Sequence, residues 1–121
     1  MVAEQGESGK GYEVVHLDAL PGVRCPCGTT RRAFADVPDA PASLHRVVID
    51  RDARTHYHKT LTEIYYVLEG EGVMELDGES VPVGPGSSVL IRPGCRHRAV
   101  GDMTILNVPI PRFDASDEWF D

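Results

Sequence analysis

The amino-acid sequence predicts an all-β protein folded as a single sandwich or barrel. Short apolar runs follow one another along most of the chain, and many of them alternate with polar residues. Gly and Pro stand between these runs, and almost no stretch shows the period of an amphipathic helix. A chain of 121 residues has the length of one domain with one hydrophobic core.

The candidate strands are short, and turn signals separate them. We expect strands at residues 12–17, 29–35, 44–49, 55–59, 62–69, 72–76, 80–83, 87–91, 97–100 and 103–108. Leu20-Pro21-Gly22 ends the first of these strands. Asp77-Gly78 predicts a type I′ hairpin turn between two later strands, because both residues tolerate positive φ angles.

The two ends of the chain differ from the central region, residues 12–110. Residues 1–11 are polar and rich in Gly and Glu, which predicts a flexible, disordered segment. Residues 111–121 form an acidic tail that contains Trp119 and Phe120. We expect these two aromatic side chains to pack on the barrel or on a dimer partner. A gate over the mouth of the barrel is the alternative.

Charge and cysteine content argue against several classes of protein. The net charge of −7 disfavours nucleic acid or an anionic membrane surface as the main partner. Three cysteines, an odd number, do not indicate a disulfide framework. Neither a signal peptide nor an apolar stretch of transmembrane length is evident, so we expect a cytoplasmic protein.

The most informative pattern is a pair of histidines, His56 and His58, followed by Glu63. Alternate residues of an extended strand point to one face, so the two imidazoles should project side by side. Glu63 should return on the next strand, and His97 is a fourth candidate far along the chain. Three neutral nitrogens and one carboxylate oxygen suit a divalent transition metal ion.

These residues resemble the two sequence motifs of the cupin family. The first motif is a His-x-His pair followed by Glu and Gly, and the second contains Gly, a turn and His. The matching positions are His56, His58, Glu63 and Gly70 for the first motif, and Gly86, Gly94 and His97 for the second. The interval between the motifs, residues 71–85, is as short as in compact microbial cupins.

Three positions depart from the family pattern. Asp50 and Gly101 stand where the motifs have Gly and Asn, and Arg92 stands where the second motif has Pro. All three are turn or support positions rather than ligand positions. The departures therefore affect local loop geometry more than metal binding.

The resemblance implies a fold, a cofactor and partners. The implied fold is a small antiparallel β-barrel, a double-stranded β-helix or jelly roll. The implied cofactor is one divalent transition metal ion: Fe, Mn, Ni, Co or Zn. The implied partners are a small-molecule ligand in the barrel and a second copy of the chain in a homodimer. A cupin pocket without metal and a coincidental match are the alternatives to a metal site.

Tyr65 and His45 are the candidate catalytic residues beside the metal. Tyr65 follows Glu63 by two residues, so alternation places it on the inner face with Val67. It is a candidate to donate a proton, to hydrogen-bond a substrate or simply to fill space. His45 is on the inner face of residues 44–49, as a candidate acid or base or as a histidine satisfied within the core.

The cysteine pair Cys25-Pro26-Cys27 has two interpretations. It is too closely spaced for a zinc knuckle, and it is not the Cys-x-x-Cys redox motif. The two thiols could bind a soft metal or respond to oxidation. Ordinary thiols in a loop beside the barrel are the other interpretation.

Three functions fit the predicted metal site. The first is a small metalloenzyme that acts on a small polar metabolite by oxygenase, isomerase or lyase chemistry. We slightly prefer an oxygenase, because an octahedral ion with four protein ligands keeps two open positions. The second is a non-catalytic module that binds a small molecule or a metal. The third is a closed tetrahedral zinc site that only stabilises the fold.

Overall fold

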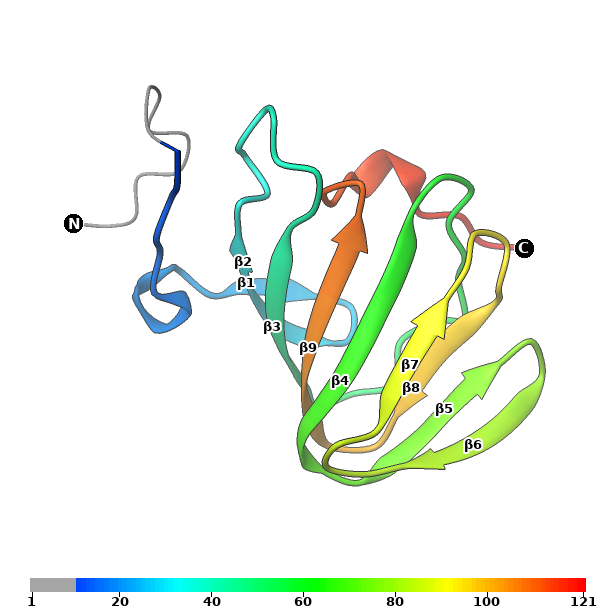
Figure 1. Ribbon diagram of the computed structural model, residues 1–121. Coiled ribbons are helices and arrows are strands. Elements are labelled where there is room, and N and C mark those ends of the chain that lie inside the picture. Colours follow the sequence, from blue (N-terminus) through cyan, green and yellow to red (C-terminus); the bar gives the residue numbers. More distant parts are fainter. Residues whose placement is uncertain (1–10) are drawn as a thin grey trace.

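A computed structural model of the protein describes residues 11–121. Within these residues it contains nine β-strands in two antiparallel sheets and two short 3₁₀ helices. Figure 1 shows the two sheets facing each other, as in a small antiparallel barrel of the jelly-roll type. The all-β fold class is therefore confirmed. The expected disordered segment, residues 1–11, lies outside the described residues except for Gly11.

Eight of the nine strands lie where the sequence predicted a strand, with small differences at their ends, and the strand at residues 23–25 was not predicted. They are β1 (Val23–Cys25), β2 (Gly28–Ala33), β3 (Leu44–Ile49), β4 (Thr62–Gly70), β5 (Gly72–Leu76), β6 (Glu79–Val83), β7 (Ser88–Ile91), β8 (His97–Val100) and β9 (Met103–Ile110). The 3₁₀ helices are η1 (Leu17–Ala19) and η2 (Ala115–Asp117). The larger sheet has the order β1-β2-β3-β9-β4-β7, and the smaller sheet has the order β6-β5-β8.

Alternation along β3 and β4 brings polar side chains into the apolar interior. On β3, His45, Val47 and Ile49 are all buried. On β4, Glu63 and Val67 are buried, whereas the residues on either side of each are more exposed. Because alternate residues of a strand share one face, His45 and Glu63 project into the same interior as the apolar core.

The predicted hairpin turn between β5 and β6 is confirmed. Asp77 has a φ angle of 49° and Gly78 a φ angle of 85°. Two successive positive φ angles are the mark of a type I′ turn. Leu76 pairs with Glu79 directly beside the turn, so the local turn signal fixes the register of this hairpin.

The strand expected at residues 12–17 is absent, and that prediction was wrong. These residues run as coil into η1, and the edge of the larger sheet is instead β1. β1 pairs only with β2, which leaves residues 12–17 without a ladder. A strand is stable only when its backbone groups find a partner strand, and Val14 is 69% exposed.

The strand expected at residues 55–59 is reduced to two isolated bridges. His56 pairs with His97, and Tyr57 pairs with Trp119. The backbone is still held against neighbouring segments on both sides, although it forms no continuous ladder. The alternation expected at His56 and His58 therefore depends on these bridges rather than on a regular sheet.

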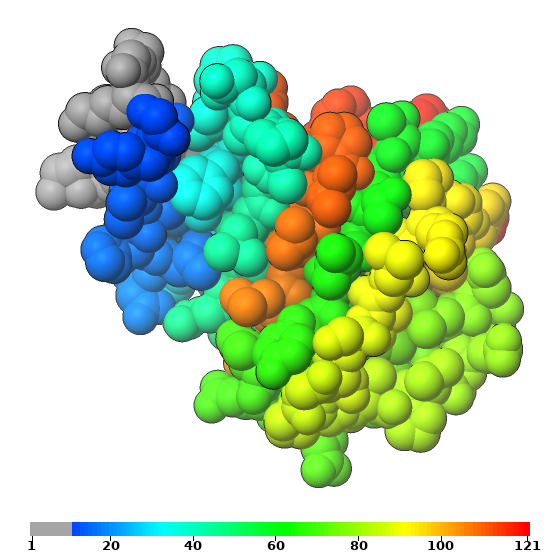
Figure 2. Space-filling view, viewed as in Figure 1, coloured from blue at the N-terminus to red at the C-terminus, as the bar shows by residue number. Residues whose placement is uncertain are grey.

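The outer face of the larger sheet is visible in the space-filling view. In Figure 2, β9 (orange) runs between β3 and β4, with β7 (yellow) beyond β4.

Within residues 11–121, no helical segment has the length and apolar character needed to span a lipid bilayer.

Candidate metal centre

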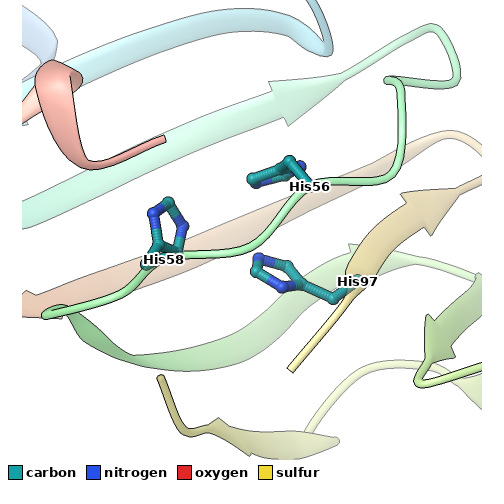
Figure 3. Close-up of side chains that lie close together, drawn as sticks. All are labelled: His56, His58 and His97. Carbon is teal, nitrogen blue, oxygen red and sulfur yellow. The ribbon is translucent and has the colours of Figure 1, made fainter. Parts of the chain in front are cut away.

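Three histidines from two distant parts of the chain meet inside the barrel. His56 and His58 lie on the segment before β4, and His97 is the first residue of β8. Their nearest ring nitrogens all lie within 4.8 Å of one another (Figure 3). Backbone hydrogen bonds of 3.1 and 2.9 Å join His56 and His97 and fix the approach of the two segments. This histidine cluster could hold a metal ion.

Each of the three imidazoles is oriented by a backbone carbonyl. Nδ1 lies 3.1 Å from the carbonyl oxygen of Arg54 in His56, 2.7 Å from that of Asp117 in His58, and 2.9 Å from that of Cys95 in His97. A carbonyl oxygen only accepts, so each Nδ1 must carry the proton. In a neutral imidazole, Nε2 then carries no proton, and its lone pair is free to bind a metal. This is the usual arrangement of histidines that bind a metal through Nε2.

Glu63 closes the fourth side of the cluster. Its Oε1 lies 3.0 Å from Nε2 of His58 and 3.2 Å from Nε2 of His97. The buried Nε2 of His58 has no hydrogen-bond partner in spite of this proximity. Lone pairs on these nitrogens and on the carboxylate repel one another unless a proton or a metal cation lies between them. The donor set therefore fits a divalent transition metal ion.

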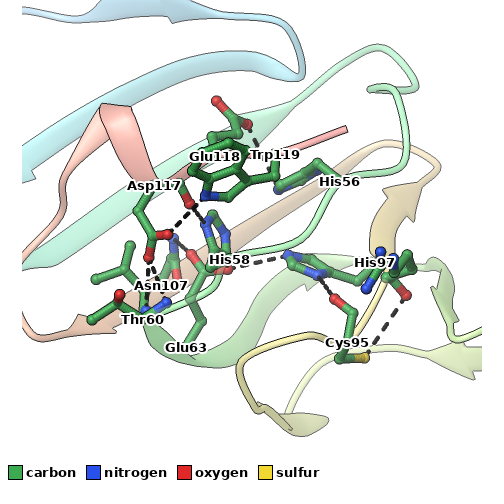
Figure 4. A network of polar contacts seen from close by, with 12 residues as sticks. His56, His58, Thr60, Glu63, Cys95, His97, Asn107, Asp117, Glu118 and Trp119 are labelled. Carbon is green, nitrogen blue, oxygen red and sulfur yellow. Dashed lines mark hydrogen bonds and ion pairs between the residues drawn. The ribbon is translucent and has the colours of Figure 1, made fainter. Parts of the chain in front are cut away.

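A neighbouring strand holds the Glu63 carboxylate in place. Nδ2 of Asn107, on β9, donates to Oε2 of Glu63 at 2.9 Å (Figure 4). Asn107 pairs with Tyr65 on one side and with His45 on the other. This hydrogen bond leaves Oε1 turned toward the histidines.

The charges of the cluster stabilise one another. Burial raises the pKa of Glu63, but the adjacent imidazoles of His58 and His97 outweigh it and hold that pKa well below its ordinary value. Burial lowers the pKa of His58, but the Glu63 carboxylate 3.0 Å from its Nε2 outweighs burial, so this pKa is raised. Burial and the neighbouring His97 lower the pKa of His56. An ionised Glu63 among imidazoles favours a cation at the centre.

The C-terminal residues lie against this cluster. The Asp117 carboxylate accepts hydrogen bonds of 2.9 Å from the backbone amides of Lys59, Thr60 and Leu61. Oε2 of Glu118 lies 3.8 Å from Nε2 of His56. As Figure 4 shows, the tail therefore supplies both a support for His58 and a second carboxylate near the site.

The sequence analysis missed three residues of this environment: Asn107, Asp117 and Glu118. Asn107 lies on a predicted strand, and its inward direction could have been derived from alternation with the buried Ile105. No sequence pattern pointed to Asp117 and Glu118. The C-terminal tail has no alternation of apolar and polar residues from which its course along the barrel could be predicted.

Tyr65 and His45, the predicted catalytic residues, lie in different surroundings. The Tyr65 ring lies 6.2 Å from the His97 ring at an interplanar angle of 85°, and its hydroxyl makes no hydrogen bond within the described residues. Burial and the charge of Glu63 raise the pKa of Tyr65 well above its ordinary value. Nε2 of His45 hydrogen-bonds the Ser43 hydroxyl at 2.9 Å, so His45 already has a partner within the core.

A cavity near the site lies beside the C-terminal tail. It measures about 760 Å³, and its lining includes Leu61, Phe113, Asp117 and Trp119. None of the four predicted metal ligands is among its described lining residues.

The sequence belongs to a known family. Residues 44–108 match the model of the cupin domain, which covers more than half of the chain. The matched region contains the histidine cluster, Glu63 and Asn107. This protein is therefore a cupin, as its fold and its histidine motif indicated.

Solved structures and a curated relative share this fold. A protein from Planctomyces limnophilus is 40% identical, with a TM-score of 0.87, over 90% of this chain and 96% of that one. The Streptomyces nucleoside dehydratase Pac13 is 24% identical, with a TM-score of 0.78, over 90% of this chain and 89% of its own. An uncharacterized protein of Methanocaldococcus jannaschii is 39% identical over 70 residues. These residues are 56% of this chain and only 54% of that relative, so the match spans about half of its length.

Proposed function

We propose that this protein is a metal-dependent cupin enzyme that acts on a small polar metabolite. His56, His58, Glu63 and His97 hold one divalent transition metal ion: Fe, Mn, Ni, Co or Zn. The observation that carries the proposal is the shared tautomer of the histidines. Each Nδ1 lies on a backbone carbonyl, and Nε2 of His58 and of His97 both face Oε1 of Glu63. A histidine packed only for stability has no need of an unpartnered, buried Nε2 such as that of His58.

The bound ion would supply Lewis acidity or redox chemistry at this site. Among the reaction classes we place oxygenase chemistry slightly before isomerase or lyase chemistry, because four protein ligands leave two positions of an octahedral ion for substrate or dioxygen. Tyr65 donates a hydrogen bond or a proton to the substrate from its unpartnered hydroxyl. His45 acts as an acid or base only if a substrate displaces its hydrogen bond to Ser43.

Comparison with other cupins selects no ligand for this protein. Pac13 is described as a nucleoside dehydratase, and its structures contain uridine. At 24% identity this likeness shows the fold alone. We therefore propose only the size and polarity of the ligand, which enters the barrel.

Metal binding is the first test. The purified protein, stripped with a chelator, is titrated with Co²⁺, Fe²⁺, Mn²⁺, Ni²⁺ and Zn²⁺ beside the variants His58→Ala and His16→Ala. His16 is exposed and lies outside the cluster, so it is a matched control for the loss of an imidazole. We expect one bound equivalent in the wild type and in His16→Ala, and a large loss of affinity in His58→Ala.

Turnover separates an enzyme from a binding module. The loaded protein is screened for oxygen uptake and for conversion of a panel of nucleosides, sugar phosphates and small carboxylates. Turnover that disappears in His58→Ala supports the enzyme. Retained metal without turnover of any compound favours the non-catalytic module. Zinc whose removal abolishes the folded state favours a structural ion.

A further inference from the structure

Two cysteine side chains lie in contact at the turn between β1 and β2. Cys25 ends β1, Gly28 begins β2, and only Pro26 and Cys27 lie between them. The Sγ atoms of Cys25 and Cys27 are 2.6 Å apart. Both side chains are partly buried against the hydrophobic core, and neither belongs to the histidine cluster.

The backbone holds this turn firmly against β3. The Cys27 carbonyl accepts hydrogen bonds from the amides of Asp50 at 3.0 Å and Arg51 at 3.3 Å. Gly28 has a φ angle of 151°, and a Cβ at this position would collide with the carbonyl of Val48. The turn therefore cannot shift without breaking these contacts, and the two sulfur atoms remain neighbours in the folded protein.

We propose that Cys25 and Cys27 form a reversible disulfide in the folded protein, with a low-molecular-weight disulfide such as oxidised glutathione as the oxidant. The Cys25 thiolate attacks one sulfur of the small disulfide and releases one small thiol. The Cys27 thiol then gives up its proton to water, and its sulfur attacks Cys25 in the mixed disulfide and releases the second small thiolate, which takes up a proton. The two protein thiols lose two electrons and two protons, and the small disulfide is reduced to two thiols.

The surroundings of the two cysteines set the order of these steps. Burial and the hydrogen bond with Cys25 raise the pKa of Cys27 to about 12, so its thiol stays protonated at neutral pH. The thiolate is the reactive form, so Cys27 is disfavoured as the first nucleophile and we assign the first step to Cys25. The close approach of the sulfur atoms gives the second step a high effective concentration.

The disulfide would form against the same core cluster as a residue of the candidate site. Cys25, Cys27 and Tyr65 pack against the same core cluster. Oxidation replaces the two thiols by one disulfide bond in this part of the barrel wall. The inference does not depend on the proposed enzymatic function, because thiol oxidation is measured directly.

Mass spectrometry of the intact protein tests the proposal. The folded, reduced protein is incubated with oxidised glutathione, and its free thiols are then blocked with N-ethylmaleimide. The chain has three cysteines. We expect a species that has lost two hydrogen atoms and carries one blocked thiol, and a reductant should restore three blocked thiols. Cys95→Ser should still form the bond, whereas Cys25→Ser and Cys27→Ser should not.

Several results would overturn the proposal. Three blocked thiols after exposure to excess oxidised glutathione would show that the pair does not close. Persistent glutathione adducts would show that the second step fails. A bond that forms only in urea, where circular dichroism reports an unfolded chain, would belong to the denatured state and not to this turn. A bond that requires Cys95 would assign the chemistry to another pair.

Discussion

Asn107 shows how a residue that binds no metal can still determine a metal site. Its side chain is buried, and its Nδ2 donates to Oε2 of Glu63 at 2.9 Å. That hydrogen bond selects which carboxylate oxygen faces His58 and His97. Partners of this kind orient metal ligands, and their loss often weakens metal binding.

We expect Asn107→Leu to weaken metal affinity about 10- to 100-fold while the barrel stays folded. The physical reason is the freedom that Glu63 gains when Oε2 loses its donor. Titration of the apoprotein with Co²⁺ measures the affinity, and circular dichroism measures the fold. Thr104→Ala on the same strand is the control. Thr104 is three residues from Asn107, so its side chain lies on the opposite, outer face of β9. Equal affinities in Asn107→Leu and the wild type would contradict this role.

His45 makes the stability of the protein depend on pH. Burial and the nearby Arg32 lower the pKa of His45 to about 4, against the raising effect of Glu63. In the unfolded chain the pKa of His45 returns to about 6.5. Between about pH 4 and pH 6.5 the unfolded state therefore binds a proton that the folded state does not bind. Stability supplied by neutral His45 is therefore complete above about pH 6.5 and is lost as the pH falls toward 4.

We expect His45→Gln to reduce this acid sensitivity. Glutamine can keep a hydrogen bond to Ser43 but cannot bind the proton. Urea unfolding at about pH 7 and about pH 5 should show a smaller loss in the variant than in the wild type, by about 1–2 kcal/mol. His16→Gln should behave as the wild type, because His16 is exposed. Identical acid sensitivity in all three proteins would show that His45 does not control it.

At the scale of elements, the C-terminal tail is fastened beside the histidine cluster. The backbone of Trp119 pairs with Tyr57, and the Lys59 ammonium lies 3.6 Å from the centre of the Trp119 ring. Burial would raise the pKa of Asp117, but amide hydrogen bonds from Lys59 and its neighbours lower it to about 2. The ionised Asp117 carboxylate is therefore one of the anchors of the tail.

We expect Asp117→Asn to loosen the tail and to lower the free energy of unfolding by about 1–3 kcal/mol. The neutral amide cannot accept as strongly from three backbone amides. The single tryptophan reports the docking of the tail, so its fluorescence should shift toward that of a solvated indole. Asp114→Asn is the matched control, since Asn caps a helix as well as Asp and Asp114 caps only Ser116. Equal fluorescence and stability in both variants would show that Asp117 does not anchor the tail.

At the scale of the whole molecule, the larger sheet presents an apolar outer face. Figure 2 shows this face, formed by β3, β9, β4 and β7. Its exposed apolar side chains, each between 38 and 52% exposed, are Val48, Ile64, Tyr66, Leu68, Leu90 and Ile110. A large exposed apolar surface commonly marks an interaction site. If the chain forms the expected homodimer, we propose this sheet as its interface.

We expect Leu90→Arg to convert a wild-type dimer into a monomer. Leu90 is 52% exposed on β7, and a charge in an apolar interface loses its hydration without gaining a partner. Light scattering coupled to gel filtration measures the mass. Val81→Arg is the control, because Val81 is comparably exposed, at 39%, but lies on β6 in the smaller sheet. A monomeric wild type, or a dimer that only Val81→Arg disrupts, would contradict this interface.

Local signals predicted much of this protein because local geometry produces them. Alternation in residues 44–49 and 62–69 predicted β3 and β4 and their inward faces, and Asp77-Gly78 predicted a turn that the φ angles confirm. The failure at residues 12–17 has the opposite cause. Their side chains resemble a strand, but a strand also needs a partner, and these residues run as coil into η1 without pairing to the sheet.

The sequence by itself determined the all-β fold, the cupin motif and the histidines that meet in the barrel, since each follows from spacing within a few residues or from the family pattern. Only the tertiary structure decided what surrounds them. The hydrogen bond from Asn107 to Glu63 spans 44 residues, and the one from His58 to the Asp117 carbonyl spans 59. Contacts over such separations depend on how the sheets and the tail pack, which no local period encodes.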